Sequence, residues 1–270
     1  MSEGIRINKY LSEIGYCSRR QADKLIEQGR IMVNSKEAVM GYKVQKDDVI
    51  HVDGEKIKQK KTKRIFIALN KPKGVVCTTN AGVEENNIID FIKFRERIFP
   101  IGRLDKTTTG LILLTNDGST ANKILKTSYN NEKEYLVRVN RPISEDVLKK
   151  MSEGVAIVGK KTRKCKVEQI SQFIFKIVLT QGLNRQIRRM SEYLGYEVVA
   201  LKRIRIINIS LDVPLGRYRD LTDAEILELN QLIEPSSKTE EASLPKIETV
   251  KRRTEFIKRD DPRYKNPGDY

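Results

Sequence analysis

Two polar stretches of the sequence bring together residue types that can do chemistry. The first, PIGRLDKTTTGLILLTNDG over residues 100–118, places Arg103 and Asp105 in a loop that leads through Gly110 into an apolar strand expected at 111–115. Loops held by a rigid scaffold often carry functional side chains, and a carboxylate can act as a base or a nucleophile. An aspartate beside an arginine also commonly forms an ion pair or caps a loop, so both interpretations stand at this point.

The second stretch, GLNRQIRRM over residues 182–190, is strongly basic. Its apolar and basic residues recur at helical spacing on opposite faces, which predicts a helix over 184–195 that Gly195 closes. A basic helix face is, taken alone, typical of a solvated surface.

The composition argues against several kinds of catalytic site. His51 is the only histidine, so a Ser-His-Asp triad or a multi-histidine metal site is not expected. Cys17, Cys77 and Cys165 show no CxxC spacing and are odd in number, which disfavours a disulfide framework or a zinc ribbon and favours small buried hydrophobes. Neither GxxxxGK[ST] nor a GxGxxG after a strand is present. Any catalysis must therefore rest on a carboxylate, hydroxyl, phenol, lysine or arginine.

The net charge points to a polyanionic partner. The 270 residues include 52 Lys+Arg against 36 Asp+Glu, a formal net charge of +16, which favours nucleic acid before membrane. No apolar run approaches the ~20 residues that span a bilayer, and the N-terminus lacks a basic-then-apolar signal pattern. We therefore expect a cytoplasmic protein with no membrane partner.

The pattern along the chain divides it into four parts. Residues 1–57 predict a small module with helices over 5–15 and 18–29, the second capped by Ser18, and two β stretches with a hairpin turn at Asp53-Gly54. The lysine-rich stretch 58–64 is expected to be a basic linker. Residues 65–234 predict an α+β domain. Residues 235–270, with few large aliphatic residues and four prolines, predict a disordered basic tail.

Within the α+β domain, β-type runs alternate with a few helices. The strands are expected in the runs 64–70, 73–79, 110–117, 134–140, 165–170, 174–180 and 196–211. The helices are expected near 119–128, 144–153, 184–195 and 222–233.

Four ordered motifs resemble the signatures of the RsuA-type bacterial rRNA pseudouridine synthases, closest to their RluF branch. They are NKPKG at 70–74, GRLDKTTTGLILLTNDG at 102–118, EKEYLV at 132–137 and GLNRQIRRM at 182–190. The pattern RINKYLSEIGYCSRRQADKLIEQGRIMVN at 6–34 is similar to the S4 RNA-binding module, which precedes the catalytic domain in this family. The resemblance covers residues 5 to about 233 and implies an S4-like module followed by a mixed, mainly antiparallel sheet.

The resemblance also implies a catalytic site made of Asp105, Tyr135 and Arg188, with Arg188 pairing the aspartate. Pseudouridine formation breaks the N1–C1′ bond of uridine and remakes it at C5, which needs a carboxylate at the ribose and no cofactor or metal. A nearby guanidinium would keep Asp105 ionised. Whether Asp105 attacks C1′ or removes a ribose proton to give a glycal stays open. Tyr135 could stack on the detached uracil or help move the C5 proton.

Further residues are expected to contact the substrate. Arg103 resembles the family residue that fills the space of a flipped nucleotide, although a phosphate contact fits it equally well. Leu179 and Gln181 could line the pocket, with core packing the simpler role for Leu179. Lys71 could contact RNA or support the catalytic loop. In the S4-like module, phosphate contacts are expected from Arg6, Lys9, Arg19, Arg20 and Lys24.

The partner implied by the resemblance is ribosomal RNA, most plausibly a structured stem-loop of 23S rRNA, bound by a monomer. A synthase that acts on tRNA and a non-catalytic S4-type ribosome-assembly factor are alternatives. The second of these leaves the GRLD, KEY and RQIRRM motifs without a purpose. A metal-dependent RNA hydrolase that uses Asp105 and Asp117 is a further alternative, but a convergent carboxylate cluster is missing.

Overall fold

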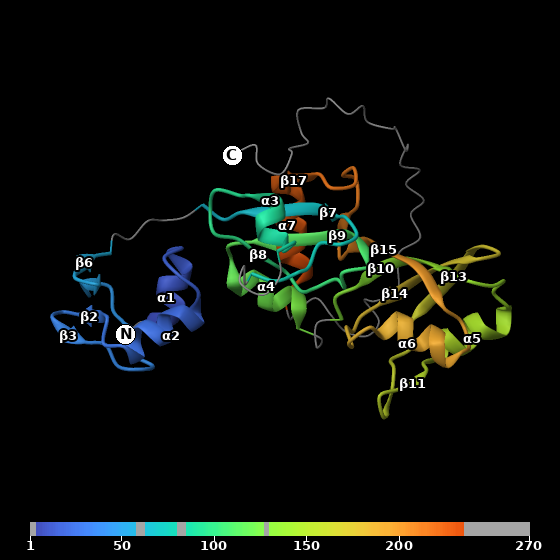
Figure 1. Cartoon of the computed structure of the whole chain (residues 1–270), viewed down its shortest axis with the longest axis horizontal. Helices are drawn as coiled ribbons and strands as arrows, with labels where there is room; N and C mark the ends of the chain where they lie inside the picture. The colour runs from blue at the N-terminus through green and yellow to red at the C-terminus, as the bar shows by residue number, and fades with distance from the viewer. Residues whose placement is uncertain (1–3, 58–62, 80–84, 127–129, 235–270) are drawn as a thin grey trace. The chain divides into compact units, whose positions relative to one another are not determined.

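The chain forms two compact units in its computed structural model (Figure 1), which describes residues 4–57, 63–79, 85–126 and 130–234. The first unit comprises residues 1–64 with 116–118, and the second comprises residues 65–115 with 119–270. The expected basic tail and residues 58–62 of the expected linker lie outside the described residues.

The first unit begins with the two predicted helices, α1 (Ile7–Glu13) and α2 (Arg19–Glu27). The predicted cap of α2 is confirmed: Gln21 N donates to Ser18 Oγ at 3.2 Å, and Ser18 N donates to Gln21 Oε1 at 2.9 Å. This reciprocal capping box satisfies two backbone donors at the helix start. Both helices pack on the module's small sheet through a core that includes Leu11, Ala22 and Ile31.

That sheet has the strand order β3-β2-β5-β6, and β1 and β4 form a separate two-stranded sheet. The predicted hairpin turn at Asp53-Gly54 joins β5 to β6, and both turn residues have positive φ, 54° and 83°. The strands are β1 (Ile5–Arg6), β2 (Ile31–Val33), β3 (Lys36–Glu37), β4 (Lys43–Val44), β5 (Ile50–Val52) and β6 (Glu55–Lys56).

The second unit is built on a nine-stranded sheet with the order β13-β14-β10-β15-β9-β7-β17, to which β8 and β16 add as short partners of β9 and β15. All its pairs are antiparallel except β9 with β15, so the expected mixed, mainly antiparallel sheet is confirmed. The strands are β7 (Phe66–Lys71), β8 (Phe99–Pro100), β9 (Thr109–Thr115), β10 (Lys133–Val139), β13 (Lys166–Ser171), β14 (Ile174–Leu179), β15 (Val198–Ile206), β16 (Ile209–Ser210) and β17 (Tyr218–Asp220).

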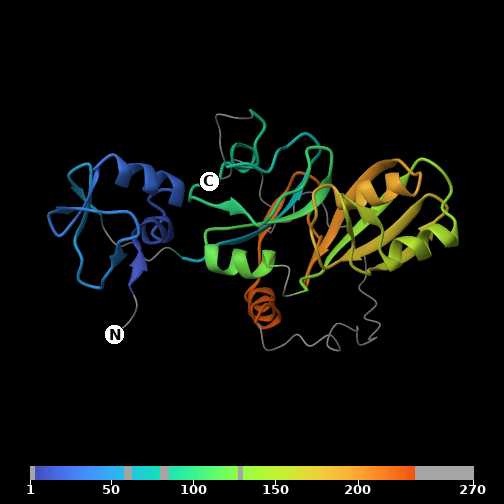
Figure 2. The same cartoon turned by 90° about the horizontal axis from the view of Figure 1, so that it is seen from below.

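Helices cover both faces of this sheet. In β7, the alternation of side chains sends Phe66 and Ala68 to the core under α4 and α7, and Ile67 and Leu69 to the core under α3. Figure 2 shows α3 on one side of these strands and α4 with α7 on the other. The helices of this unit are α3 (Ile88–Ile92), α4 (Gly118–Leu125), α5 (Glu145–Glu153), α6 (Gln186–Tyr193) and α7 (Asp223–Leu232), and a small hairpin adds β11 (Ala156–Ile157) and β12 (Lys160–Lys161).

The other half of the sheet, β13, β14, β10 and β15, packs against α5 and α6. Its core includes Phe175 and Ile177 of β14, Met151 of α5, and Ile187 and Met190 of α6. The four helices expected from the sequence are therefore all confirmed, with ends shifted by a few residues.

Two strand predictions are wrong. The run 73–79 is a loop with a single bridge, Val76 to Asn87, because Pro72 lacks an N–H and Gly74 turns the chain at φ 96°. The run 196–211 is not continuous: the chain turns at Ile207, with φ 53°, and β16 folds back on β15.

Candidate active site

Asp105 lies on a loop between β8 and β9 that several backbone contacts hold in place. Leu104 is buried in the core, and its N–H donates to Cys77 Sγ at 3.3 Å. Lys106 O accepts from Gly74 N at 2.8 Å, and Thr108 N donates to Asp105 O at 3.0 Å. With Leu104 anchored inward, Arg103 and Asp105 on either side of it face the outside of the core.

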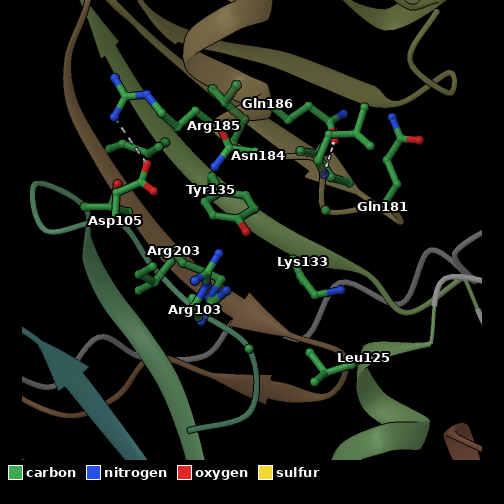
Figure 3. Close-up of a pocket in the computed structure, with 18 of the residues that line it drawn as sticks. Arg103, Asp105, Leu125, Lys133, Tyr135, Gln181, Asn184, Arg185, Gln186 and Arg203 are labelled. Carbon is green, nitrogen blue, oxygen red and sulfur yellow. Dashed lines mark hydrogen bonds and ion pairs between the residues drawn. The ribbon is translucent and has the colours of Figure 1, made fainter. Parts of the chain in front are cut away.

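Both of these side chains line a cavity of about 290 Å³. The cavity lies between the Asp105 loop, strands β10 and β15, and the segment from the end of β14 to the start of α6. Its lining includes Arg103, Asp105, Thr108, Leu125, Lys133, Tyr135, Leu179, Gln181, Asn184, Arg185, Gln186 and Arg203. Figure 3 shows Asp105 and Tyr135 facing the same space, with Arg185 and Arg203 close by. Tyr135 and Asp105, expected to form one site, thus lie on one cavity.

The cation that pairs with Asp105 is Arg185. Arg185 Nη1 lies 3.8 Å from Asp105 Oδ2, and both side chains are partly solvent-exposed. Arg185 is the residue at the N-cap of α6 and has left-handed backbone angles, φ 50° and ψ 34°. This geometry places its side chain at the helix start, where it reaches the Asp105 loop.

Arg188, one turn further along α6, makes a different contact. Its Nη1 donates to Val198 O at 2.9 Å and its Nη2 to Thr107 Oγ1 at 3.2 Å. Burial lowers the pKa of the Arg188 guanidinium, the charge of Arg185 lowers it further, and Asp105 acts in the opposite direction. The expected direct pair between Asp105 and Arg188 is therefore corrected: Arg188 ties the Asp105 loop to β15, and Arg185 makes the ion pair.

Tyr135 stands at the centre of the sheet. It pairs with Ile177 of β14 on one side and Arg203 of β15 on the other, and the pairing with β15 shifts register between Glu134 and Tyr135. Such a bulge re-aims a side chain and is common beside active sites. The Arg203 guanidinium carbon lies 6.0 Å from the centroid of the Tyr135 ring.

The residues expected to bind substrate divide into two groups. Arg103, Leu179 and Gln181 line the cavity, although Leu179 is also only 3% exposed and packs in the core beneath it. Gln181 Nε2 is buried without a hydrogen-bond partner among the described residues.

Lys71 is fully buried and donates from Nζ to Pro72 O at 2.9 Å and Val75 O at 2.8 Å. Burial lowers the pKa of its ammonium group, while Cys77 and Asp105 oppose that shift. The expectation that Lys71 contacts RNA is therefore wrong for this structure. Lys71 holds the 72–75 turn, whose Gly74 contacts the Asp105 loop.

Several cavity residues were not expected from the sequence. Arg185 belongs to the RQIRRM motif, so its presence near Asp105 could have been considered. Arg203 is one of three basic residues in the run 196–211, beside Lys202 and Arg205, and nothing in the sequence distinguishes it from the other two. Lys133 and Thr108 flank Tyr135 and Asp105 in the sequence without a distinguishing pattern.

The residues expected to bind RNA in the first unit lie on or beside its helices. Arg19 and Arg20 are exposed in the first turn of α2, and Lys24 is exposed one turn later. Arg6 is exposed at the N-cap position of α1, where its side chain makes no capping hydrogen bond. Lys9 forms an ion pair with Glu13, 3.6 Å apart, within α1.

Two further properties concern the described residues as a whole. None of their helices is long and apolar enough to cross a membrane. They contain no group of three or more His, Cys, Asp or Glu side chains that could hold a metal ion, and Asp117 is not among the residues that line the cavity.

Comparison with known proteins agrees with both units. The family model of RNA pseudouridylate synthases matches residues 65–193, and that of the S4 domain matches residues 5–50. The chain is 51% identical over 253 residues to the dual-specificity RNA pseudouridine synthase RluF of Escherichia coli K12, covering 92% of this chain and 87% of the relative.

Two more distant proteins give the same result. The ribosomal large subunit pseudouridine synthase B of Bacillus subtilis is 35% identical over 84% of this chain and 96% of its own. A crystal structure of a pseudouridylate synthase superposes with a TM-score of 0.62 at 30% identity, covering 83% of this chain and 99% of that one.

The sheet, the cavity with its single lining carboxylate among the described residues, and the matched domains define an enzyme that isomerises uridine to pseudouridine in RNA. Within that class, the chain belongs to the RsuA-type RNA pseudouridine synthase family, whose members carry an N-terminal S4 domain.

Proposed function

We propose that the chain converts a specific uridine of 23S ribosomal RNA into pseudouridine, with Asp105 as the reacting carboxylate. The observation that carries the proposal is the shared cavity of Asp105 and Tyr135, since among the described residues Asp105 is the carboxylate that lines it. The similarity to a ribosomal large subunit pseudouridine synthase supports ribosomal RNA as the substrate.

The roles of the side chains follow from the reaction. The N1–C1′ bond must break, the uracil must turn, and C5 must bond to C1′ before its proton leaves. Arg185 Nη1, 3.8 Å from Asp105 Oδ2, pairs with the carboxylate, which acts either on C1′ or on a ribose proton. Tyr135 presents its ring to the base. Arg188 positions the loop through Thr107, and Gln181 and Leu179 shape the far wall of the cavity.

The substrate base must leave its stack before it enters this cavity, which costs a few kcal/mol. Arg103 is exposed at the mouth of the cavity, where its guanidinium can fill the space that the nucleotide vacates or hold a phosphate. Phosphate contacts from Arg6, Lys9, Arg19, Arg20 and Lys24 would bring the S4 module onto the same RNA.

A second RNA substrate is also supported. Relatives that are about half identical to this chain bear the name dual-specificity RNA pseudouridine synthase, and tRNA is the candidate for the second RNA. We further propose an S4 module over 1–57, a linker over 58–64 and a catalytic domain over 65–234, and that the chain acts as a monomer. Its place of action would be where ribosomal RNA is made and assembled, the cytoplasm of a bacterium.

Purified chain incubated with separate transcripts of 23S rRNA, 16S rRNA and tRNA tests the proposal, with pseudouridine mapped chemically in each. We expect conversion at one position in 23S rRNA, unchanged by a chelator because no metal acts in the scheme. Conversion in 16S rRNA with none in 23S rRNA would refute the assignment, and conversion only in tRNA would move the substrate to the second candidate.

A further inference from the structure

Arg203 is held in the middle of the sheet by an unusually close approach of two strands. It lies on β15 opposite Gly110 of β9, in the parallel pair of the sheet. A Cβ at position 110 would lie 2.2 Å from Arg203 O, so only glycine, here at φ 100°, permits this register. The arrangement brings Arg203 beside both the Asp105 loop, which precedes β9, and Tyr135 on β10.

The side chain of Arg203 is nearly enclosed but not fully paired. It is 3% exposed, and its Nε donates to Leu111 O at 2.7 Å. Its guanidinium lies over the Tyr135 ring, and the residue lines the cavity, as Figure 3 shows beside Tyr135. Nη2 is buried without a hydrogen-bond partner among the described residues. A buried, unpaired donor on a charged group is rare and calls for a partner that is absent at rest.

The reaction supplies such a partner. When the N1–C1′ bond breaks, its electron pair leaves with the base, and the negative charge spreads over N1 and the two carbonyl oxygens of uracil. This holds whether Asp105 forms a bond to C1′ or takes the C2′ proton as the C1′–C2′ double bond forms. In both cases the aspartate loses its own negative charge, to the new C1′–O bond or to the proton that it takes. The negative charge therefore moves from the carboxylate to the uracil, and the cavity must stabilise it there.

The other cations of the cavity are placed for different tasks. Arg185 is engaged by Asp105, Arg103 is exposed at the mouth, and Lys133 donates to Asn131 O at 3.2 Å. Arg203 instead is buried in the wall of the cavity beside Tyr135, next to the space that the base would occupy. A fixed donor in a site shielded from water stabilises developing charge strongly because it needs no reorganisation.

We propose that Arg203 is a catalytic residue that donates from Nη2 to a carbonyl oxygen of the detached uracil and stabilises its anion. The inference rests on the placement of the base in the Asp105–Tyr135 cavity proposed above. When C5 has bonded to C1′ and lost its proton, N1 is protonated, the anion disappears and the contact weakens.

The test compares Arg203→Gln and Arg203→Lys with the wild-type chain under single-turnover conditions, on the RNA fragment in which the wild type is active. Lys202→Gln is the matched control, because Lys202 is exposed on the same strand and does not line the cavity. Arg203→Gln is expected to lower the maximal rate by roughly 10²-fold or more, the usual loss for one such donor, with little change in the RNA concentration at half-maximal rate. Arg203→Lys should retain part of the rate, and Lys202→Gln all of it.

A second readout separates chemistry from structure. In an RNA with 5-fluorouridine at the target, the fluorine withdraws electrons and stabilises the uracil anion, so loss of the N-linked nucleoside should depend less on Arg203. We expect the defect of Arg203→Gln to shrink by roughly tenfold on this RNA. An equal defect on both RNAs, or a wild-type rate for Arg203→Gln, would overturn the inference. Failure of the wild type to act on the fragment would instead refute the proposed function.

Discussion

The charged side chains that lie near Asp105 are cations. The nearest cation is Arg185, and the buried Lys71 and the tethered Arg188 both respond electrostatically to its carboxylate. These positive charges attract the phosphates of RNA toward the acidic group that, in the proposed reaction, must reach the ribose.

Asp105→Asn should abolish pseudouridine formation while leaving the fold intact, because the side chain keeps its size but loses its reactive charge. We expect the rate to fall by at least roughly 10²–10⁴-fold, the usual loss for a positioned acid or base. The measurement is pseudouridine formed on the active RNA, with RNA affinity and thermal unfolding followed in parallel. Asp146→Asn, an exposed change of the same kind on α5, is the control. Wild-type turnover in Asp105→Asn would remove Asp105 from the reaction.

Arg188 and Arg185 should give different defects. Arg188→Lys keeps the charge but cannot reach Val198 O and Thr107 together, so it should retain some activity, whereas Arg188→Met should lose roughly 10²-fold through misplacement of the loop. Arg185→Met removes the ion pair with Asp105 and should lower the rate, because the carboxylate loses the cation that helps to hold it in place.

Arg189→Met is the control for loss of a charge on the same helix, since Arg189 contacts Asn184 and not the loop. The rates of all four variants are measured on the same RNA. If Arg188→Met and Arg188→Lys are equally active, Arg188 does not position the loop. If Arg185→Met is as active as Arg189→Met, the ion pair of Arg185 with Asp105 has no part in the reaction.

The motifs located the cavity but not the orientation of every side chain. Asp105, Tyr135, Arg103, Leu179 and Gln181 all line it, as a site of adjacent motifs would require. The pairing of Asp105 depends on the left-handed backbone of Arg185, and no propensity predicts that angle for an arginine. The place of Arg203 in the cavity could not be predicted, because no local sequence pattern marks a buried cation on a strand.

At the scale of elements, the parallel contact between β9 and β15 is the joint of the catalytic unit. It connects the half of the sheet covered by α3, α4 and α7 to the half covered by α5 and α6. The cavity lies at this joint, since Asp105 enters from the first half and Tyr135 from the second.

Gly110→Ala should therefore disturb both stability and activity. The new Cβ would meet Arg203 O at 2.2 Å in a backbone conformation that alanine avoids. We expect a loss of at least about 1–3 kcal/mol in the free energy of unfolding, measured by denaturant titration. Gly182→Ala is the matched control, because nothing lies within 4 Å of its Cβ position. Equal stability of both variants would show that β15 can retreat from β9 without cost.

Much of the element order followed from hydrophobic periodicity and helix caps. Ser18 predicted the start of α2, and Asp53-Gly54 predicted the hairpin between β5 and β6, because both signals act through local backbone chemistry. The run 73–79 has strand composition, but Lys71 Nζ donates to Pro72 O and Val75 O and holds a turn there. Gly74 N donates to Lys106 O, a long-range contact that no local pattern contains. The five-residue helix α3 is too short for a periodic signal.

At the scale of the whole molecule, the proposed function assigns RNA recognition to the first unit and chemistry to the second. Arg19→Gln together with Arg20→Gln should weaken RNA binding and flatten its dependence on salt, since both side chains are exposed at the start of α2. Each lost phosphate contact should lower the log–log salt slope by roughly 0.7–0.9. Binding isotherms across salt concentrations measure the slope, and Lys36→Gln with Lys56→Gln on the small sheet removes equal charge as a control. An unchanged slope in the arginine variant would assign the contact to the catalytic unit.

Selectivity for one uridine should also be a property of the whole molecule. In the proposed reaction Asp105 and Tyr135 contact only the target nucleotide, so they can recognise a uracil but cannot distinguish one uridine of the RNA from another. Phosphate contacts fix the register of an RNA without reading its sequence, and bases in loops are splayed out more cheaply than paired ones. The choice must therefore depend on how the surrounding RNA is folded.

We expect a folded stem-loop fragment of 23S rRNA to react well, and the same fragment to react poorly when mutations on one side disrupt its stem. Compensating mutations on the other side, which restore pairing with a new sequence, should restore the rate. Pseudouridine formation on the three RNAs is the measurement, with free uridine expected to react poorly. Equal rates on the folded and disrupted fragments would mean that a linear motif is read, and failure of the compensated stem would mean that the stem's own sequence is read.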